Sequence, residues 1–275
     1  MQKKTSRTLG FCAVLLVLAL LGVGSVVNIF VGNPLSKIGA QYTAEKHLKK
    51  YYGKTDYVLE GVSYSYKAGG YYAYLSSPSN VDGDFTLTIS MFGELQSDDY
   101  QLRVEEKWNV ANRLFLEYRD LVDTVLTSSS YPYALSMGFG NLEFDLELGE
   151  EEVEGALKRS ELENNKRYDV SALGAKNGSL VLYVDSDEVT AGKAVEILLE
   201  TKRLMDAEEI AFYSVELILR YPPYNEDKSY ERPEGEVRLR DFLASDIYEE
   251  NMTARVEQCI ADTKAYYEEQ NKDKK

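Results

Sequence analysis

An uncharged and mostly aliphatic run from Leu9 to Val31 constrains this chain more than any other feature of its sequence. The run reaches the roughly 20 residues that an α-helix needs to cross a hydrocarbon core about 30 Å thick. Three basic residues precede it: Lys3, Lys4 and Arg7. Since the first acidic residue is Glu45, the charge pattern predicts a cytoplasmic N-terminus over residues 1–8. We therefore expect a single-pass anchor over residues 9–31 in the cell membrane, with the lipid bilayer as its partner and the C-terminal region extracytoplasmic.

Cleavage of this segment as a signal peptide is the alternative to its retention. A cleaved signal has an apolar stretch of about 7–15 residues followed by a small-x-small site. The run here is longer and ends at Gly32 and Asn33, although small residues between Ala19 and Ser25 could offer a site within it. The length of the run favours retention as an anchor.

The exported part of the chain is strongly acidic. The sequence holds 31 Lys and Arg against 46 Asp and Glu, and the three basic residues before the anchor leave a net charge of about −18 outside. Nucleic acids are bound largely through neutralisation of phosphates by Lys and Arg, so this balance argues against a nucleic-acid partner. It equally argues against anionic lipid as a partner. A solvated acidic surface explains the charge, and divalent cations or a cationic partner are compatible with it.

Cysteine usage excludes covalent stabilisation of the exported part. Cys12 lies inside the apolar run, so Cys259 is the one cysteine that follows it. An intramolecular disulfide and a cysteine-based metal site are therefore both excluded there. The stability of this part must come from packing, to which the 22 tyrosines and 9 phenylalanines of the chain contribute much apolar area.

The first half of the exported part predicts an α+β module over residues 33–127. Asn33 and Pro34 suit the N-cap and first position of a helix. The expected buried face of that helix consists of Leu35, Ile38, Tyr42, Leu48 and Tyr52. Apolar and polar residues then alternate in three segments, which predicts an antiparallel meander: Val62 to Tyr66, Tyr72 to Leu75 and Phe85 to Met91.

A long amphipathic helix is expected to complete this first module. Ser97 suits its N-cap, and Asp98 and Asp99 suit its first turn. One apolar stripe then follows in 4-3-4-3 spacing: Val104, Trp108, Ala111, Phe115, Tyr118, Val122 and Val125. We expect this stripe to cover the meander, and the alternative is a coiled-coil contact with a partner helix.

The second half predicts another α+β module over residues 133–270, followed by a disordered tail at 271–275. A strand with an acidic outer face is expected from Leu142 to Leu148. The pattern strand, helix, strand over Leu180 to Val184, Ala191 to Met205 and Phe212 to Tyr221 is that of a βαβ unit. A short strand near Val237 and a final helix capped by Asp246 and Glu249 complete it. The predicted fold class is thus α+β, with the N-terminal transmembrane helix followed by two small modules, each a mostly antiparallel sheet covered by helices.

Catalytic motifs are missing from the sequence. His47 is the sole histidine, and it is expected beside the apolar face of its helix and exposed to solvent. No HExxH, CxxC or glycine-rich phosphate loop occurs, and no serine lies in a nucleophile elbow. We assign no catalytic residue and no cofactor, and we do not expect an enzyme. Paired carboxylates that cleave glycans remain an alternative, because 46 acidic residues always supply some pair.

Three acidic groups have a spacing that could supply oxygen ligands to a cation. They are Asp82 with Asp84, the strand residues Glu143, Asp145 and Glu147, and Asp185 with Asp187 and Glu188. Calcium sites use flexible loops with several carboxylates, but none of these groups has the EF-hand pattern. Turn chemistry, helix capping and a solvated sheet face explain them, so no metal site is assigned. A divalent-cation sensor stays as a second alternative.

Several local patterns resemble the YfjL-like family of small membrane-anchored bacterial proteins. The residues that carry the resemblance are Asn33 to Lys37, Val62, Tyr64, Tyr71 to Tyr74, Ser76 to Ser79, Asp82 to Phe85, Glu117, Tyr118, Leu173 to Lys176 and Arg220 to Pro222. They extend over nearly the whole exported region and are packing and turn patterns. The resemblance implies the anchor and the two-part α+β layout, and it supplies no site residues. We expect a binding, interaction or structural role in the cell envelope, with an envelope protein or polymer as partner.

Overall fold

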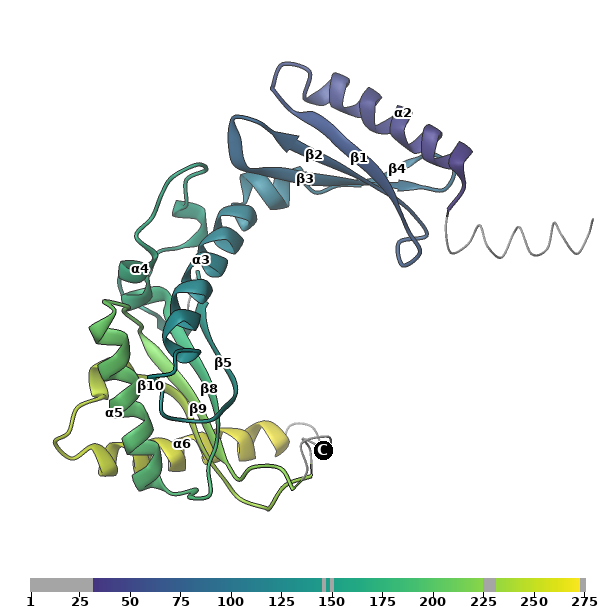
Figure 1. The fold of residues 1–275 in the computed structure, drawn as a ribbon. Coiled ribbons are helices and arrows are strands. Elements are labelled where there is room, and N and C mark those ends of the chain that lie inside the picture. Colours follow the sequence, from purple (N-terminus) through teal and green to yellow (C-terminus); the bar gives the residue numbers. More distant parts are fainter. Residues whose placement is uncertain (1–31, 145–146, 149–150, 225–230, 273–275) are drawn as a thin grey trace, which may run out of the picture. The chain divides into compact units, whose positions relative to one another are not determined.

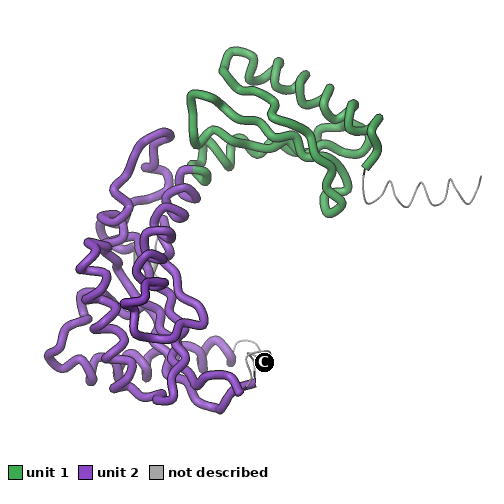
Figure 2. The backbone as a smooth tube through the Cα atoms, in the orientation of Figure 1, with its two compact units in different colours: residues 1–109 green, residues 110–275 purple. Residues whose placement is uncertain are grey.

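A computed structural model describes residues 32–144, 147–148, 151–224 and 231–272. The chain divides into two compact units, residues 1–109 and residues 110–275 (Figure 2). Each unit contains a four-stranded sheet together with helices, so the predicted α+β class is confirmed (Figure 1). The predicted anchor lies outside the described residues. Of the helices that are described, none combines the length and the apolar character needed to span a bilayer.

The first unit is built on an antiparallel sheet. Its elements are α2 (Pro34–Tyr51), β1 (Val58–Ser65), β2 (Gly70–Ser77), β3 (Asn80–Ser90), β4 (Leu95–Asp98) and the π-helix η1 (Gln101–Glu105). The strands lie in the order β1-β2-β3-β4, each antiparallel to the one before. Phe85, Leu87 and Ile89 all turn to the core, as period-2 alternation requires. The predicted three-strand meander is confirmed, and β4 extends it.

The fourth strand occupies the place where the sequence predicts a helix start. Ser97 and Asp98 pair with β3 instead of capping a helix. After η1, Lys107 takes a left-handed conformation with φ of 65°, and α3 (Trp108–Leu126) begins at the next residue. Side chains are strained at positive φ, so such a residue interrupts a helix. The single apolar stripe that the sequence predicts is therefore divided between two elements.

Helix α2 turns a different face to the sheet from the one that its large apolar residues predict. Ala40 and Ala44 are fully buried against the first core. Leu35, Ile38 and Tyr42 are exposed, so this part of the prediction is wrong. Short alanine side chains let the helix backbone lie close to the sheet, whereas three bulky side chains would hold it away. The remaining two predicted residues do pack against the core: Leu48 and Tyr52.

The second unit contains a mixed sheet. Its principal elements are α3, β5 (Leu135–Leu142), β6 (Glu147–Leu148), β7 (Glu151–Glu152), α4 (Val170–Asn177), β8 (Gly178–Asp185), α5 (Ala191–Ala207), β9 (Ser214–Arg220), β10 (Glu236–Leu243) and α6 (Met252–Lys272), with 3-10 turns at Arg159–Glu161 and Ala244–Asp246. The main sheet has the order β10-β9-β8-β5. Strands β8 and β9 are parallel and joined through α5, so the predicted βαβ unit is confirmed.

Helix α3 belongs to the core of the second unit. Its buried residues include Leu114, Tyr118 and Val122, and all of them lie in the second core rather than the first. A methyl group built on Gly140 or Gly174 would come within 3.0 Å of the Tyr118 ring, so the ring fills a socket that only glycine leaves open. The expectation that this helix covers the meander is wrong, and the boundary between the units falls at residues 109 and 110 instead of 127–133.

The acidic strand predicted between residues 142 and 148 does not form as one element. Strand β5 ends at Leu142, and the short hairpin β6-β7 follows. Just beyond the end of β5, the buried side-chain amide of Asn177 donates to the carbonyl oxygens of Glu143 and Leu157 at 2.7 and 2.9 Å. These bonds tie the segment after β5 to the end of α4.

Helix α6 begins six residues after the predicted cap Asp246, which lies in a 3-10 turn. Its Thr263 hydroxyl accepts the backbone N–H of Arg240 at 3.1 Å, on the outer edge of β10. The helix thereby covers an edge strand that would otherwise expose unpaired backbone groups. Residues 271 and 272 of the predicted tail are helical, and residues 273–275 lie outside the described part.

Candidate functional site

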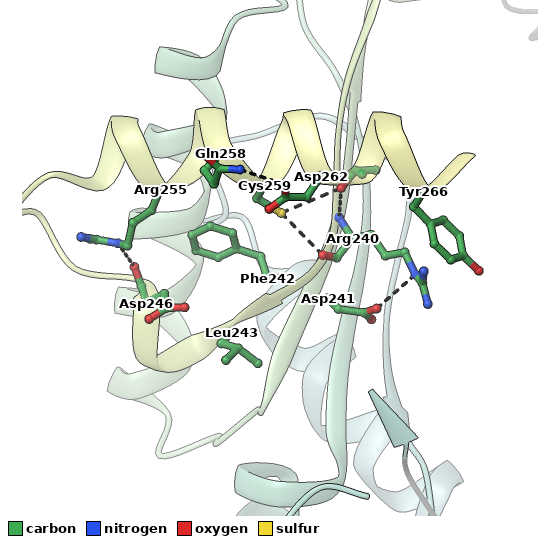
Figure 3. Close-up of a pocket in the computed structure, with 11 residues that line it drawn as sticks. Arg240, Asp241, Phe242, Leu243, Asp246, Arg255, Gln258, Cys259, Asp262 and Tyr266 are labelled. Atoms are coloured by element: carbon green, nitrogen blue, oxygen red, sulfur yellow. Dashed lines mark hydrogen bonds and ion pairs between the residues drawn. The ribbon is translucent and has the colours of Figure 1, made fainter. Parts of the chain in front are cut away.

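A pocket of about 440 Å³ lies between strand β10 and helix α6 (Figure 3). Polar groups of both charges surround it, with Phe242 and Leu243 as apolar walls. The other lining residues are Arg240, Asp241, Asp246, Arg255, Gln258, Cys259, Asp262, Thr263 and Tyr266. Apolar walls with a few convergent polar groups are typical of ligand sites. The sequence did not predict this pocket, because it depends on a register shift in β10 and on how α6 packs against that strand.

A β-bulge in β10 forms one wall of the pocket. The pairing of β10 with β9 shifts register between Leu239 and Phe242. Within this shift Asp241 has a φ of 52°, in the left-handed region that non-glycine residues rarely occupy. A bulge adds one residue to a strand and redirects its side chains. Backbone strain of this kind costs on the order of 1–3 kcal/mol and concentrates at functional sites.

The thiol of Cys259 lies on the α6 wall and contacts the carbonyl oxygen of Arg240 at 3.5 Å. Burial raises the pKa of this thiol above its usual range. The nucleophile in cysteine chemistry is the thiolate, so a raised pKa lowers the reactivity of Cys259 near neutral pH. Its position makes it a structural donor in the wall of the pocket.

The two arginines of the pocket are committed to neighbouring groups. Arg255 donates to the carbonyl oxygens of Asp246, Tyr248 and Glu250 at 2.9, 2.5 and 2.5 Å, and so fixes the segment before α6. Arg240 lies 3.1 Å from the carboxylate of Asp241. The guanidinium of Arg240 also lies 3.8 Å from the centre of the Tyr266 ring. Arg240 is therefore held in an ion pair, whereas Arg255 is held by backbone carbonyl oxygens.

The carboxylates of the pocket have further positions at which they can accept hydrogen bonds. Asp262 accepts one bond from Gln258 at 2.8 Å, and Asp241 forms an ion pair with Arg240. A carboxylate has about four acceptor positions, so most of these remain available. Three aspartates against two committed arginines give the pocket an acidic character. The arrangement suits a ligand group that is cationic and donates hydrogen bonds.

Asp185, one of the predicted cation ligands, is instead an ion-pair acceptor. Arg220 and Arg232 donate to its Oδ1 at 3.2 and 2.9 Å. Asp187 lines a pocket of about 470 Å³ beside it, together with Lys193. Glu188 accepts a bond at 3.0 Å from Thr190, the N-cap of α5. These acids thus lie near the end of strand β8. There Asp185 pairs with two arginines and Glu188 binds the N-cap residue of α5.

The other predicted acidic residues are not gathered into a site: Asp82 and Asp84 lie in strand β3 rather than in the loop before it. Asp82 is 2% exposed, and Asn109 donates to the carbonyl oxygens of Asp82 and Asp84 at 3.0 and 2.6 Å. Glu143 accepts from Asn141. Asp145 lies outside the described residues, and the side chain of Glu147 is not described. In the described part of the chain, no group of three or more His, Cys, Asp or Glu side chains is placed to hold a metal ion.

His47 is not exposed as the sequence predicts, since its side chain keeps only 13% of its surface accessible. Its Nε2 lies 2.7 Å from Oδ2 of Asp98, the same oxygen that accepts the Tyr52 hydroxyl at 2.8 Å. Burial and the bond to Asp98 raise the pKa of Tyr52. Asp98 is 51 residues from His47, so no local pattern could have paired them.

Comparisons with known proteins identify both halves of the chain. Residues 7–104 match the family model described as the YfjL-like N-terminal domain. Residues 117–257 match the model described as the YfjL-like C-terminal domain. The gap between the two matches contains the boundary between the two units. Neither a curated protein nor a solved structure gives a significant match. The chain therefore belongs to the YfjL-like family, as the packing and turn patterns of its sequence indicate.

Proposed function

We propose that this protein is a single-pass, membrane-anchored binding protein of the bacterial cell envelope. The uncharged run from Leu9 to Val31 is the anchor, and the basic residues before it keep the N-terminus in the cytoplasm. Both units then lie on the extracytoplasmic side. The second unit holds a partner, an envelope protein or polymer, in the pocket between β10 and α6.

The pocket itself carries the binding part of this proposal. Its volume of about 440 Å³ matches the lower range of small-ligand sites. The bulge at Asp241 keeps a strained backbone conformation at the pocket wall. Free acceptor positions on Asp241 and Asp262 favour a primary amine or guanidinium group of the partner. Such groups occur on peptides and on amino sugars, both of which are exposed in cell envelopes.

Photo-crosslinking in intact cells tests the binding role. A photoreactive phenylalanine in place of Tyr266 lies at the pocket, whereas the same residue in place of Tyr224 is exposed on the second unit and is not among the pocket residues. We expect a defined crosslinked product from position 266 and none from position 224. Asp262→Asn should reduce the yield of the product from position 266, because a cationic group of the partner then meets one carboxylate fewer in the pocket. Equal products from both positions would refute the pocket as the binding site.

The anchor and its orientation need a separate test. A protease-sensitive tag at the C-terminus should be cleaved in spheroplasts without lysis, and the protein should sediment with membranes after a high-salt wash. A tag that becomes sensitive only after lysis, or protein that is recovered without membrane, would refute the proposed topology.

A further inference from the structure

The outward face of helix α2 is an apolar surface in the first unit. Leu35, Ile38 and Tyr42 keep 76%, 65% and 66% of their surface accessible. Their spacing of three and four residues places them on one side of the helix, opposite the buried Ala40 and Ala44. Single exposed apolar residues are common, but three in register on one helix form a patch of the kind that contacts a partner or a membrane.

Lysines continue the same face toward the end of the helix. Lys46 and Lys49 extend the 3-4-4-3 spacing from Tyr42, and both are exposed. Helix α2 carries four lysines and one acidic residue, Glu45, whose carboxylate accepts a bond from Gln41 at 2.9 Å. This local excess of positive charge contrasts with the net charge of −15 of the whole chain.

The start of α2 is tied firmly to the first unit. The Tyr71 hydroxyl accepts the backbone N–H of Asn33 at 3.0 Å and donates to the carbonyl oxygen of Asn33 at 2.9 Å. Asn33 also caps the helix through its side chain, which accepts from the backbone N–H of Leu35 at 2.8 Å. The position of the helix relative to its own sheet is therefore set from its first residue.

The distance from the apolar run to α2 is short. Leu35 follows Val31 by four residues, and an extended chain covers at most about 3.6 Å per residue. Leu35 therefore lies within roughly 15 Å of the end of the run. If that run spans the bilayer, as the proposed function has it, the first turns of α2 are held at the membrane surface.

We infer that the outward face of α2 docks on the bilayer itself. The inference rests on the anchor in the proposed function and adds a second membrane contact to it. Leu35, Ile38 and Tyr42 enter the boundary between headgroups and acyl chains, where the apolar face of an interfacial helix is buried by about 5–10 Å. Lys46 and Lys49 lie on anionic headgroups, which attract basic residues within a Debye length of the surface. This contact orients the first unit on the membrane.

Depth-dependent fluorescence quenching in nanodiscs tests this surface. The full chain carries Cys12→Ser and Cys259→Ser, and one new cysteine at Ile38→Cys is labelled with a small environment-sensitive fluorophore. The discs contain phosphatidylcholine and phosphatidylglycerol, with or without a lipid that is spin-labelled near its headgroup. The matched control is Val81→Cys, an exposed aliphatic position on β3 with 72% accessibility. We expect the spin label to lower emission at position 38 about twofold or more and to leave position 81 unchanged.

Charge variants and the elution of the protein separate the outcomes. Lys46→Glu with Lys49→Glu, or discs of phosphatidylcholine alone, should weaken the quenching at position 38. Quenching that is equal at positions 38 and 81 would overturn the inference, as would a disulfide between two copies of the unlabelled Ile38→Cys variant together with no quenching of the labelled one. Protein that elutes apart from the discs would overturn the anchor and the inference together. Protein that elutes with the discs and shows no quenching would overturn this inference alone.

Discussion

Each of the two units contains a four-stranded sheet packed against helices, but the two sheets are connected differently. In the first unit each strand pairs with its neighbour in sequence. Its core cluster contains 10 buried apolar residues, against 29 in the cluster of the second unit. In the second unit the central pair β8 and β9 is parallel, which requires the α5 crossover. Contacts between chain neighbours therefore dominate the first unit, and contacts between distant segments dominate the second.

The polar groups of the two units also differ. The first unit has a part-buried polar cluster, in which Asp98 accepts from the side chains of His47 and Tyr52 and from the backbone of Tyr100. Burial also raises the pKa of the adjacent Tyr57 to about 12. The second unit has the larger apolar core, and its charged groups lie around the pocket, at the ion pairs of Asp185 and at Glu216 on β9. A small core thus depends on hydrogen bonds for part of its specificity, whereas a larger one leaves its edge available for a ligand.

The largest effect is expected from a variant that tests whether α3 packs only in the second core. Tyr118→Ala removes a fully buried ring and the bond from its hydroxyl to the carbonyl oxygen of Ala211 at 2.9 Å. We expect a loss of about 4 kcal/mol in the stability of the second unit. Hydrogen exchange followed by mass spectrometry should show faster exchange in β8 and unchanged exchange in β2. The control Tyr118→Phe keeps the ring and should cost only about 1 kcal/mol. Faster exchange in β2 as well would contradict the assignment of α3.

The reciprocal variant tests the first core. Leu87→Ala leaves a cavity beneath the meander, where Leu87 is fully buried. We expect a loss of about 3 kcal/mol, and the small core has few neighbours that can close the gap. Faster exchange should now appear in β2 and not in β8. Exposed Leu116, on α3, provides the control, and Leu116→Ala should change neither unit. A common response of both units would show that they unfold as one.

A smaller effect is expected from the polar cluster of the first unit. Asp98→Asn replaces a carboxylate that accepts three donors by an amide with one acceptor oxygen. At least one buried donor loses its partner, which should cost the first unit about 1–2 kcal/mol. The Glu45→Gln substitution, at the single acid of α2, serves as the control. If denaturation of the two variants is indistinguishable, the cluster contributes nothing to the stability of this unit.

The smallest effect is expected on how the stability of the second unit changes with pH. Burial raises the pKa of the Glu216 carboxyl above its ordinary value of 4.5; the charge of Arg238 acts in the opposite direction. The folded state therefore holds this proton where the unfolded chain has lost it, and stability falls as the pH rises from 4.5 through the raised pKa.

Glu216→Gln should remove this pH-dependent loss of stability. We expect the variant to be more stable at pH 7.5, by at most about 1 kcal/mol since water screens a partly buried group, and equal to the parent near pH 4.5. Thermal melts across this range give the measurement. A variant that is less stable at pH 7.5 would show that Glu216 forms a net favourable ion pair.

Much of the secondary structure follows from local pattern, and the failures share one cause. The meander is readable from period-2 alternation, and the βαβ unit is readable from two apolar runs that flank an amphipathic helix. The long helix is readable as a helix, but its period could not show which sheet its face would meet. On α2 the larger apolar residues point outward and two alanines face the core. Periodicity shows which residues share one face of a helix, but it does not show how closely that helix must approach the sheet.

The candidate site was even less accessible from sequence. The predicted acidic groups are short-range clusters, and the structure uses Asp185 and Glu188 for an arginine pair and a helix cap. The pocket instead depends on a bulge at Asp241 and on the docking of α6 against β10. A bulge has no reliable signature in one sequence, because it is decided by how the strand register meets the rest of the sheet.

By itself the sequence determined the α+β class, the strands of the meander, the βαβ unit and the membership of the YfjL-like family, because these depend on spacing within short segments. Only the tertiary structure decided which core α3 completes, which face of α2 is buried and which acid meets His47. These outcomes depend on contacts between residues that are far apart in the chain, and such contacts are selected by the close packing of the whole unit.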